Sequence, residues 1–248
     1  MLLLQNNKEM IPKIIHYCWF GRNPLPPLAQ KCIESWKKYL PDYEIKEWNE
    51  DNFNINITEY TKEAYKAKKY AFVSDYARFW ILYNHGGIYF DTDVEVITPM
   101  SDIIQKGAFM GIESDEEPTV NPGLGIGAFP HMKFYEEILE KYKSISFIKQ
   151  DKTLNLKTIV EYTTETLNLY GLSSTTDVQH IKDIFIYPSE YFCPISIKDG
   201  KLRKTSNTKT IHHFAQSWQS PIRIYGRKLI LLIGGEKLKR FIKKVFIH

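Results

Sequence analysis

Cysteine is scarce in this chain, which has three cysteines among 248 residues. Cys18, Cys32 and Cys193 are an odd number without a short paired spacing, which argues against a disulfide framework and a thiolate metal site. The first ten residues hold a run of three leucines and then polar residues, too short and too polar for a signal peptide or a membrane span. We therefore expect a protein of the reducing cytoplasm.

A general excess of positive charge is also missing. The chain has a net charge of +4, and residues 221–248 alone carry eight Lys/Arg against one Glu, or +7, which leaves −3 for residues 1–220. A nucleic-acid-binding body is expected to be basic on its working face. The sequence therefore indicates one globular domain of residues 1–220 that does not bind nucleic acid, followed by a basic amphipathic tail of residues 221–248.

The apolar pattern predicts an α/β fold. Residues 13–20 form a strand-like run, residues 28–39 have helical spacing, and residues 43–48 alternate as a second strand. Strand, helix and strand in this order are typical of an α/β domain. Weaker signals follow for helices near 132–142 and 154–169 and for strands at 184–187 and 210–214.

The most informative polar residues lie around residues 72–96. Apolar residues from Phe72 onward recur at helical spacing on one face, and Asp75 and Arg78 lie off that face. Such a pair is a surface ion pair of little energetic worth, or else a site in which arginine binds diphosphate and the carboxylate binds sugar hydroxyls.

Residues 88–96 then alternate as a strand that places Asp91 and Asp93 on the same side. Two carboxylates at the end of a buried strand suit a hard divalent cation such as Mg²⁺ or Mn²⁺. Such a cation neutralises a leaving diphosphate. A solvated edge strand is the alternative explanation of the same triplet.

Five blocks of the sequence together carry a family resemblance. They are PKIIH and WFG within residues 12–21, SWKKY and PDYE within 35–44, SDYAR at 74–78, GGIYFDTDVE at 86–95, and HH and SW within 212–218. The ordered set resembles glycosyltransferase family 32, the capsular-polysaccharide and yeast outer-chain mannosyltransferase type, which is distantly similar to the large clostridial glucosylating toxins. The resemblance covers most of the chain.

The resemblance implies a GT-A type, Rossmann-like fold with a mixed central sheet and added helices. It also implies a retaining transfer of a hexose from a UDP- or GDP-sugar with Mn²⁺ or Mg²⁺. Trp19 would stack on the base, and Asp75 and Arg78 would hold the donor sugar and phosphate. Asp91 would face ribose or a metal-bound water, and Asp93 would ligate the metal. The acceptor would be a glycan or a lipid-linked sugar, as in surface polysaccharide synthesis.

The resemblance further assigns Ser217 and Trp218 to the donor site and a histidine to the metal. Adjacent strand residues face opposite ways, so only one of His212 and His213 can reach the ion, and we favour His212. A histidine satisfied by a backbone hydrogen bond is the alternative. Residues 121–127, rich in glycine, are expected to form a mobile loop near the sugar.

Four alternatives stay open at this stage. An aspartyl-phosphate-type phosphohydrolase also has an Asp-x-Asp triplet after an apolar strand, and a non-catalytic module could bind a nucleotide-sugar without turnover. Trp19 is a core residue if it merely ends the first strand. The tail either packs on the body or contacts an anionic membrane, which would place the protein on the inner face of that membrane.

Overall fold

The computed structural model describes residues 10–196 and 200–215. The chain divides into two compact units, Met1–His213 and Phe214–His248, and the fold described here is that of the first unit. The predicted boundary between residues 1–220 and 221–248 lies outside the described residues, and so does the predicted amphipathic tail. No helix among the described residues is long and apolar enough to cross a membrane.

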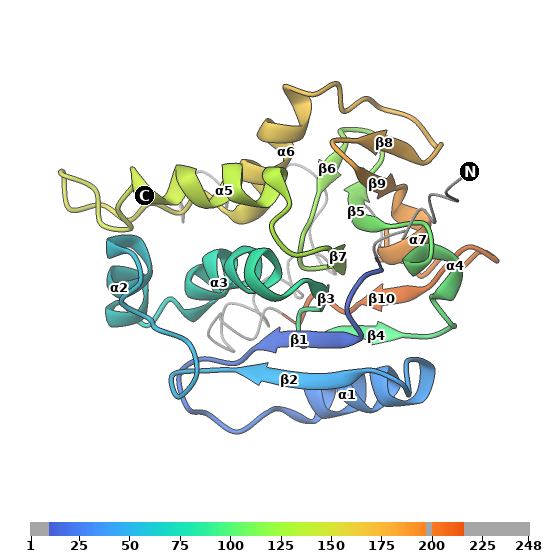
Figure 1. Cartoon of the computed structure of the whole chain (residues 1–248), viewed down its shortest axis with the longest axis horizontal. Coiled ribbons are helices and arrows are strands. Elements are labelled where there is room, and N and C mark those ends of the chain that lie inside the picture. Colours follow the sequence, from blue (N-terminus) through green and yellow to red (C-terminus); the bar gives the residue numbers. More distant parts are fainter. Residues whose placement is uncertain (1–9, 197–199, 216–248) are drawn as a thin grey trace, which may run out of the picture. The chain divides into compact units, whose positions relative to one another are not determined.

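A mixed sheet forms the centre of the unit (Figure 1). Its first three strands run parallel in the order β2-β1-β3, and β7 then pairs antiparallel with β3. Beyond β7 the order continues β5-β9-β8, with β6 beside β5. The strands are β1 Ile14–Cys18, β2 Glu44–Trp48, β3 Gly87–Tyr89, β5 Ala108–Ser114, β6 Thr119–Val120, β7 Ile126–Ala128, β8 Gln179–Ile181 and β9 Ile184–Tyr187. The predicted α/β class with a mixed central sheet is confirmed.

The helices begin where local signals favour them. Pro27 opens α1 at a position where its missing N–H costs no hydrogen bond. Thr58 and Thr158 form capping boxes at the starts of α2 and α6, so α6 begins at residue 159 and not at residue 154 as predicted. The helices are α1 Pro27–Tyr39, α2 Glu59–Lys66, α3 Tyr70–His85, α4 Ser101–Ile104, α5 Lys133–Lys143, α6 Ile159–Asn168 and α7 Ser189–Phe192.

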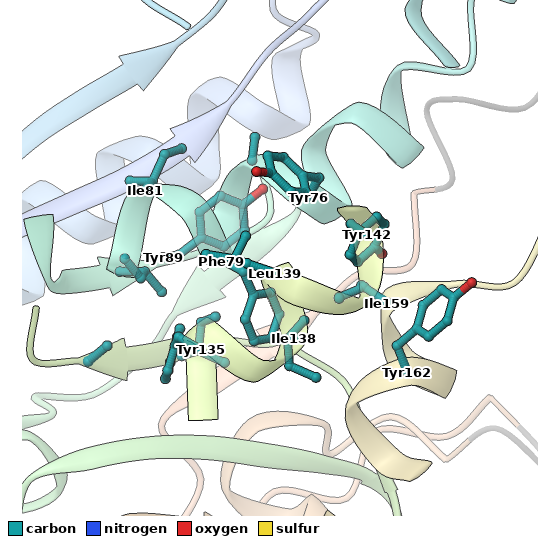
Figure 2. Close-up of a cluster of buried hydrophobic side chains, with 14 of the residues drawn as sticks. Tyr76, Phe79, Ile81, Tyr89, Tyr135, Ile138, Leu139, Tyr142, Ile159 and Tyr162 are labelled. Atoms are coloured by element: carbon teal, nitrogen blue, oxygen red, sulfur yellow. The ribbon is translucent and has the colours of Figure 1, made fainter. Parts of the chain in front are cut away.

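Helix α3 lies at the centre of the packing. It contacts β1, β3 and β7 as well as α2, α5 and α6. Figure 2 shows aromatic side chains from α3, α5 and α6 packed together, including Phe79 and Tyr135, whose ring centres are 5.1 Å apart. The prediction of a single buried face was wrong, because Asp75 and Arg78 are also buried. Their side of the helix is covered by elements that follow much later in the sequence.

The predicted continuous strand over residues 88–96 is also wrong. The chain leaves the central sheet after β3, turns at residues 91–93, and continues as β4 (Val94–Val96), which pairs antiparallel with β10 (Thr210–His212) in a separate two-stranded sheet. The amide of Val94 donates to the carbonyl of Asp91 at 3.0 Å and closes the turn. The Asp-Thr-Asp triplet therefore lies on the connection between the two sheets.

Residues 121–127, which were expected to form a mobile loop, are packed in the interior. This segment connects β6 to β7, and every residue from 121 to 128 is buried. Burial follows from its place in the fold, because β7 pairs with both β3 and β5 in the interior of the sheet.

Candidate active site

Asp91, Asp93 and His212 form a cluster where the two sheets meet. One ligand atom from each side chain lies within 4.8 Å of the other two, and Nε2 of His212 is 3.1 Å from Oδ1 of Asp93. The pairing of β10 with β4 sets His212 opposite Val94, directly after the triplet. Sequence position alone could not show this, since the histidine follows Asp93 by more than a hundred residues.

The chemistry of this cluster fits a divalent cation. It offers two carboxylates and one imidazole, a set that suits Mn²⁺ better than Mg²⁺, because Mg²⁺ prefers oxygen ligands only. Burial lowers the pKa of His212, but the charge of Asp93 and its hydrogen bond outweigh burial, so the pKa lies above its ordinary value. Asp91 and Asp93 are both half-buried, which leaves part of each side chain accessible.

His213 does not join this cluster. Its Nε2 lies 2.8 Å from Oε2 of Glu95, which also pairs with Lys31 at 2.9 Å. Adjacent strand residues face opposite sides, and this is the reason that only one of the two histidines contacts Asp93. The backbone amide of His213 donates to the carbonyl of Asp93 at 3.0 Å, so this residue holds β10 against the triplet by its main chain.

Arg78 connects the triplet to α3. Its Nη2 lies 3.1 Å from Oδ1 of Asp75 and 3.2 Å from Oδ1 of Asp91, and its Nε donates to the carbonyl of Ser74 at 3.2 Å. Burial lowers the pKa of Arg78, but Asp91, Tyr89 and Asp75 outweigh that effect, and the guanidinium stays charged. The surface ion pair that was the alternative explanation is therefore wrong, and Asp75 and Arg78 belong to a buried network that reaches the cluster.

Asp75 sits deeper in this network. Burial raises its pKa to about 6, although Arg78 and the amide of Ile159, which donates to Oδ2 at 3.2 Å, oppose the shift. A carboxylate with such a pKa changes protonation near the lower end of the physiological range. Asp75 lies on α3 against the start of α6 and pairs there with Arg78.

Two contacts at Asp91 were not predicted from the sequence. The hydroxyl of Tyr89 donates to Oδ1 of Asp91 at 3.1 Å, and the guanidinium of Arg78 lies 4.9 Å from the centre of the Tyr89 ring. A Cβ on Gly123 would stand only 2.1 Å from Oδ2 of Asp91. The alternation of residues 88–96 already placed Tyr89 on the side of Asp91, so this signal was available. The close approach of Gly123 to Asp91 could not be predicted from the sequence, because it depends on the pairing of β3 with β7.

Of the remaining predicted site residues, Trp19 is not one of the three members of the cluster, and two others lie outside the described residues. Trp19 follows β1, is half-buried, and donates from Nε1 to the carbonyl of Asn23 at 2.6 Å. It is thus not one of the core residues. Ser217 and Trp218 lie outside the described residues.

Comparison with known proteins supplies the reaction class. Residues 26–110, which include α3 and the triplet, match the family described as "Glycosyltransferase sugar-binding region containing DXD motif". The chain is a DXD-containing glycosyltransferase. The triplet Asp91-Thr92-Asp93 is its DXD motif. The phosphohydrolase alternative is thereby excluded.

Several relatives of this glycosyltransferase have names of the same class. An uncharacterized glycosyltransferase of Acanthamoeba polyphaga mimivirus is 27% identical over 225 residues, which are 82% of this chain and 85% of the relative. Inositol phosphoceramide mannosyltransferase 1 of Schizosaccharomyces pombe is 26% identical over 113 residues. That match covers 41% of this chain and 34% of the yeast protein.

Among solved structures, a glycosyltransferase involved in the glycosylation of the major capsid of PBCV-1 is similar to this one. The alignment covers 89% of this chain and 99% of that chain at 11% identity, with a TM-score of 0.46. PaToxG glycosyltransferase aligns with 53% of this chain and 60% of its own at 19% identity, with a TM-score of 0.45.

Proposed function

We propose that this glycosyltransferase moves a hexose from a UDP- or GDP-linked donor to a glycan or lipid-linked acceptor with retention of configuration and with a divalent cation, Mn²⁺ in preference to Mg²⁺. The observation that supports the proposal best is the Asp91, Asp93 and His212 cluster beside the buried Arg78. The acceptor is a precursor of a surface polysaccharide, a role that rests on the family resemblance.

Asp91, Asp93 and His212 would hold the cation. When bound, the ion supplies positive charge that stabilises the departing nucleoside diphosphate. Arg78 orients Asp91, because one guanidinium pairs with both Asp91 and Asp75. In the transfer, the bond from the anomeric carbon to the diphosphate oxygen breaks and its electron pair leaves with the diphosphate. The acceptor oxygen bonds to the anomeric carbon, and its proton passes to the departing diphosphate.

Trp19 is the proposed stacking partner of the donor base. It lies at the carboxyl end of β1, and ligands of open α/β sheets bind at that edge. An aromatic–base stack is worth roughly 1–3 kcal/mol. Trp19→Ala should therefore raise the donor KM by about tenfold or more. An unchanged KM in a folded variant would assign Trp19 a packing role only.

A nucleotide-release screen tests the proposal as a whole. The protein is incubated with UDP-glucose, UDP-galactose, UDP-N-acetylhexosamines and GDP-mannose, each with Mn²⁺, with Mg²⁺ and with chelator. A transferase with the proposed mechanism releases nucleoside diphosphate from one donor in the presence of a cation. A module that only binds the donor releases nothing. Full release in chelator would show that the cation is not required.

A further inference from the structure

Glu113 is an acidic residue near the end of β5 that has no part in the function proposed so far. Its side chain is half-buried, and its Oε2 accepts a 2.6 Å hydrogen bond from Nδ2 of Asn121. Asn121 is only 8% exposed.

The Asn121 side chain is fixed at both of its polar atoms. Oδ1 accepts from the amide of Gly123 at 2.7 Å, while Nδ2 donates to Glu113. A carboxylate can only accept and a backbone amide can only donate, so these two partners determine which way the amide group points. The main-chain amide of Asn121 donates to the carbonyl of Gly111 at 3.0 Å, which ties the residue to β5 a second time.

Gly123 passes this constraint on to Asp91. Its carbonyl accepts from the amide of Asp91 at 3.1 Å, and its α-carbon lies so close to the Asp91 carboxylate that a Cβ there would stand only 2.1 Å from Oδ2. A continuous series of contacts therefore runs from Glu113 through Asn121 and Gly123 to Asp91.

We propose that Glu113 is a positioning residue of the glycosyltransferase site, which orients Asn121 and through it the turn that supports Asp91, and so tightens cation binding. The inference rests on the cation of the proposed function. Groups that hold metal ligands in place typically change metal affinity by about tenfold to a hundredfold when they are removed. Glu113 acts on the ion through hydrogen bonds and not as a ligand.

The direct test is calorimetric titration of the full chain with Mn²⁺ alone. Glu113→Ala should weaken Mn²⁺ affinity about tenfold. Glu113→Gln should retain most of it, because the amide oxygen of glutamine still accepts from Nδ2 of Asn121. Glu117→Ala is the matched control, since Glu117 is exposed in the following turn and its loss changes the charge equally. Equal weakening by Glu113→Gln and Glu113→Ala would overturn the hydrogen-bonded route.

A double-mutant cycle separates action through Asn121 from direct action. Asn121→Ala removes the hydrogen bond between Asn121 and Glu113 by deleting its donor. It therefore measures the effect of losing this bond on Mn²⁺ affinity even if Glu113→Ala does not fold. If Glu113 acts through Asn121, the double variant binds Mn²⁺ as Asn121→Ala alone does. Additive losses would overturn the inference.

The two proposals fail in different ways. Parent and Glu113→Ala with equal Mn²⁺ affinity would overturn the role of Glu113 and leave the proposed function intact. A parent chain that binds no Mn²⁺ and turns over donor in chelator would overturn the cation of the proposed function and, with it, this inference.

Discussion

The Asp93 side chain is 17% exposed and contacts His212 of β10. Asp93→Asn keeps its shape and removes its charge, so the cation should bind poorly. The barrier to transfer should then rise by about 4 kcal/mol, or on the order of a thousandfold in rate. The fold should be spared, because Asp91 and Asp93 repel each other without a cation. Donor hydrolysis measured against Mn²⁺ concentration, together with thermal melts, checks both statements. Turnover at the parent rate would contradict the assignment of Asp93 as a ligand.

A substitution at Gly123 tests whether activity depends on the position of the Asp91 carboxylate. In Gly123→Ala the new methyl group would stand 2.1 Å from Oδ2 of Asp91 and 3.0 Å from Oδ1 of Asn121, so the Asp91 carboxylate must move. A shift of about 1 Å at a reacting site can lower the rate on the order of a hundredfold. Steady-state kinetics should show this loss with little change in the melting temperature. In an Asp91→Ala background the same substitution should add almost nothing, and a further large loss there would place the effect elsewhere.

His16, on β1, allows a prediction of how the free energy of unfolding depends on pH. Its Nε2 donates to the carbonyl of Gly86 at 3.0 Å and its Nδ1 accepts from Nε1 of Trp48 at 3.0 Å, so the ring is neutral. Burial first, and the charges of His85 and Lys46 next, lower its pKa to about 4. A lowered histidine pKa contributes stability above pH 6.5 that is lost as the pH falls toward 4. The loss amounts to about 3 kcal/mol.

Urea unfolding of the parent and of His16→Gln between pH 7 and pH 4 measures this contribution. The difference between the two proteins should shrink as the pH falls. Asp75 acts in the opposite sense, since its raised pKa adds stability as the pH falls below about 6. The comparison with the variant removes that opposing contribution because both proteins retain Asp75. His180→Gln, at an exposed position, serves as the control. A pH-independent difference would contradict the neutral, buried assignment of His16.

At the scale of elements, the sequence predicted most of the parallel half of the sheet. The strands at 13–20 and 43–48 and the helix at 28–39 carry their own patterns, and the structure places each within a few residues. The strand at 88–96 could not be resolved into β3 and β4, since its alternation continues through the turn that divides it. The burial of Asp75 could not be foreseen either, because the cover over α3 comes from α5 and α6. Local periodicity shows a helix but not what packs on its polar side.

The proposed cation site joins segments from across the first unit, so a bound ion should stabilise the whole of that unit. Because the ion binds the folded chain only, Mn²⁺ at a hundred times its Kd adds about 2.7 kcal/mol. Thermal melts with Mn²⁺ and with chelator should differ by several degrees in the parent, and the difference should vanish in Asp93→Asn. A midpoint that does not respond to Mn²⁺ in the parent would contradict a cation site at this cluster.

The pairing of β10 with β4 also has a consequence for the order in which the site is completed. A chain emerging from the ribosome delivers both aspartates of the DXD motif well before residue 210, and amino-terminal segments fold first during synthesis. A translation product that stops before Thr210 therefore carries the motif but not His212, the third member of the cluster. We expect such unfinished chains not to consume donor sugar in the cell, because activity requires the completed pairing of β10 with β4.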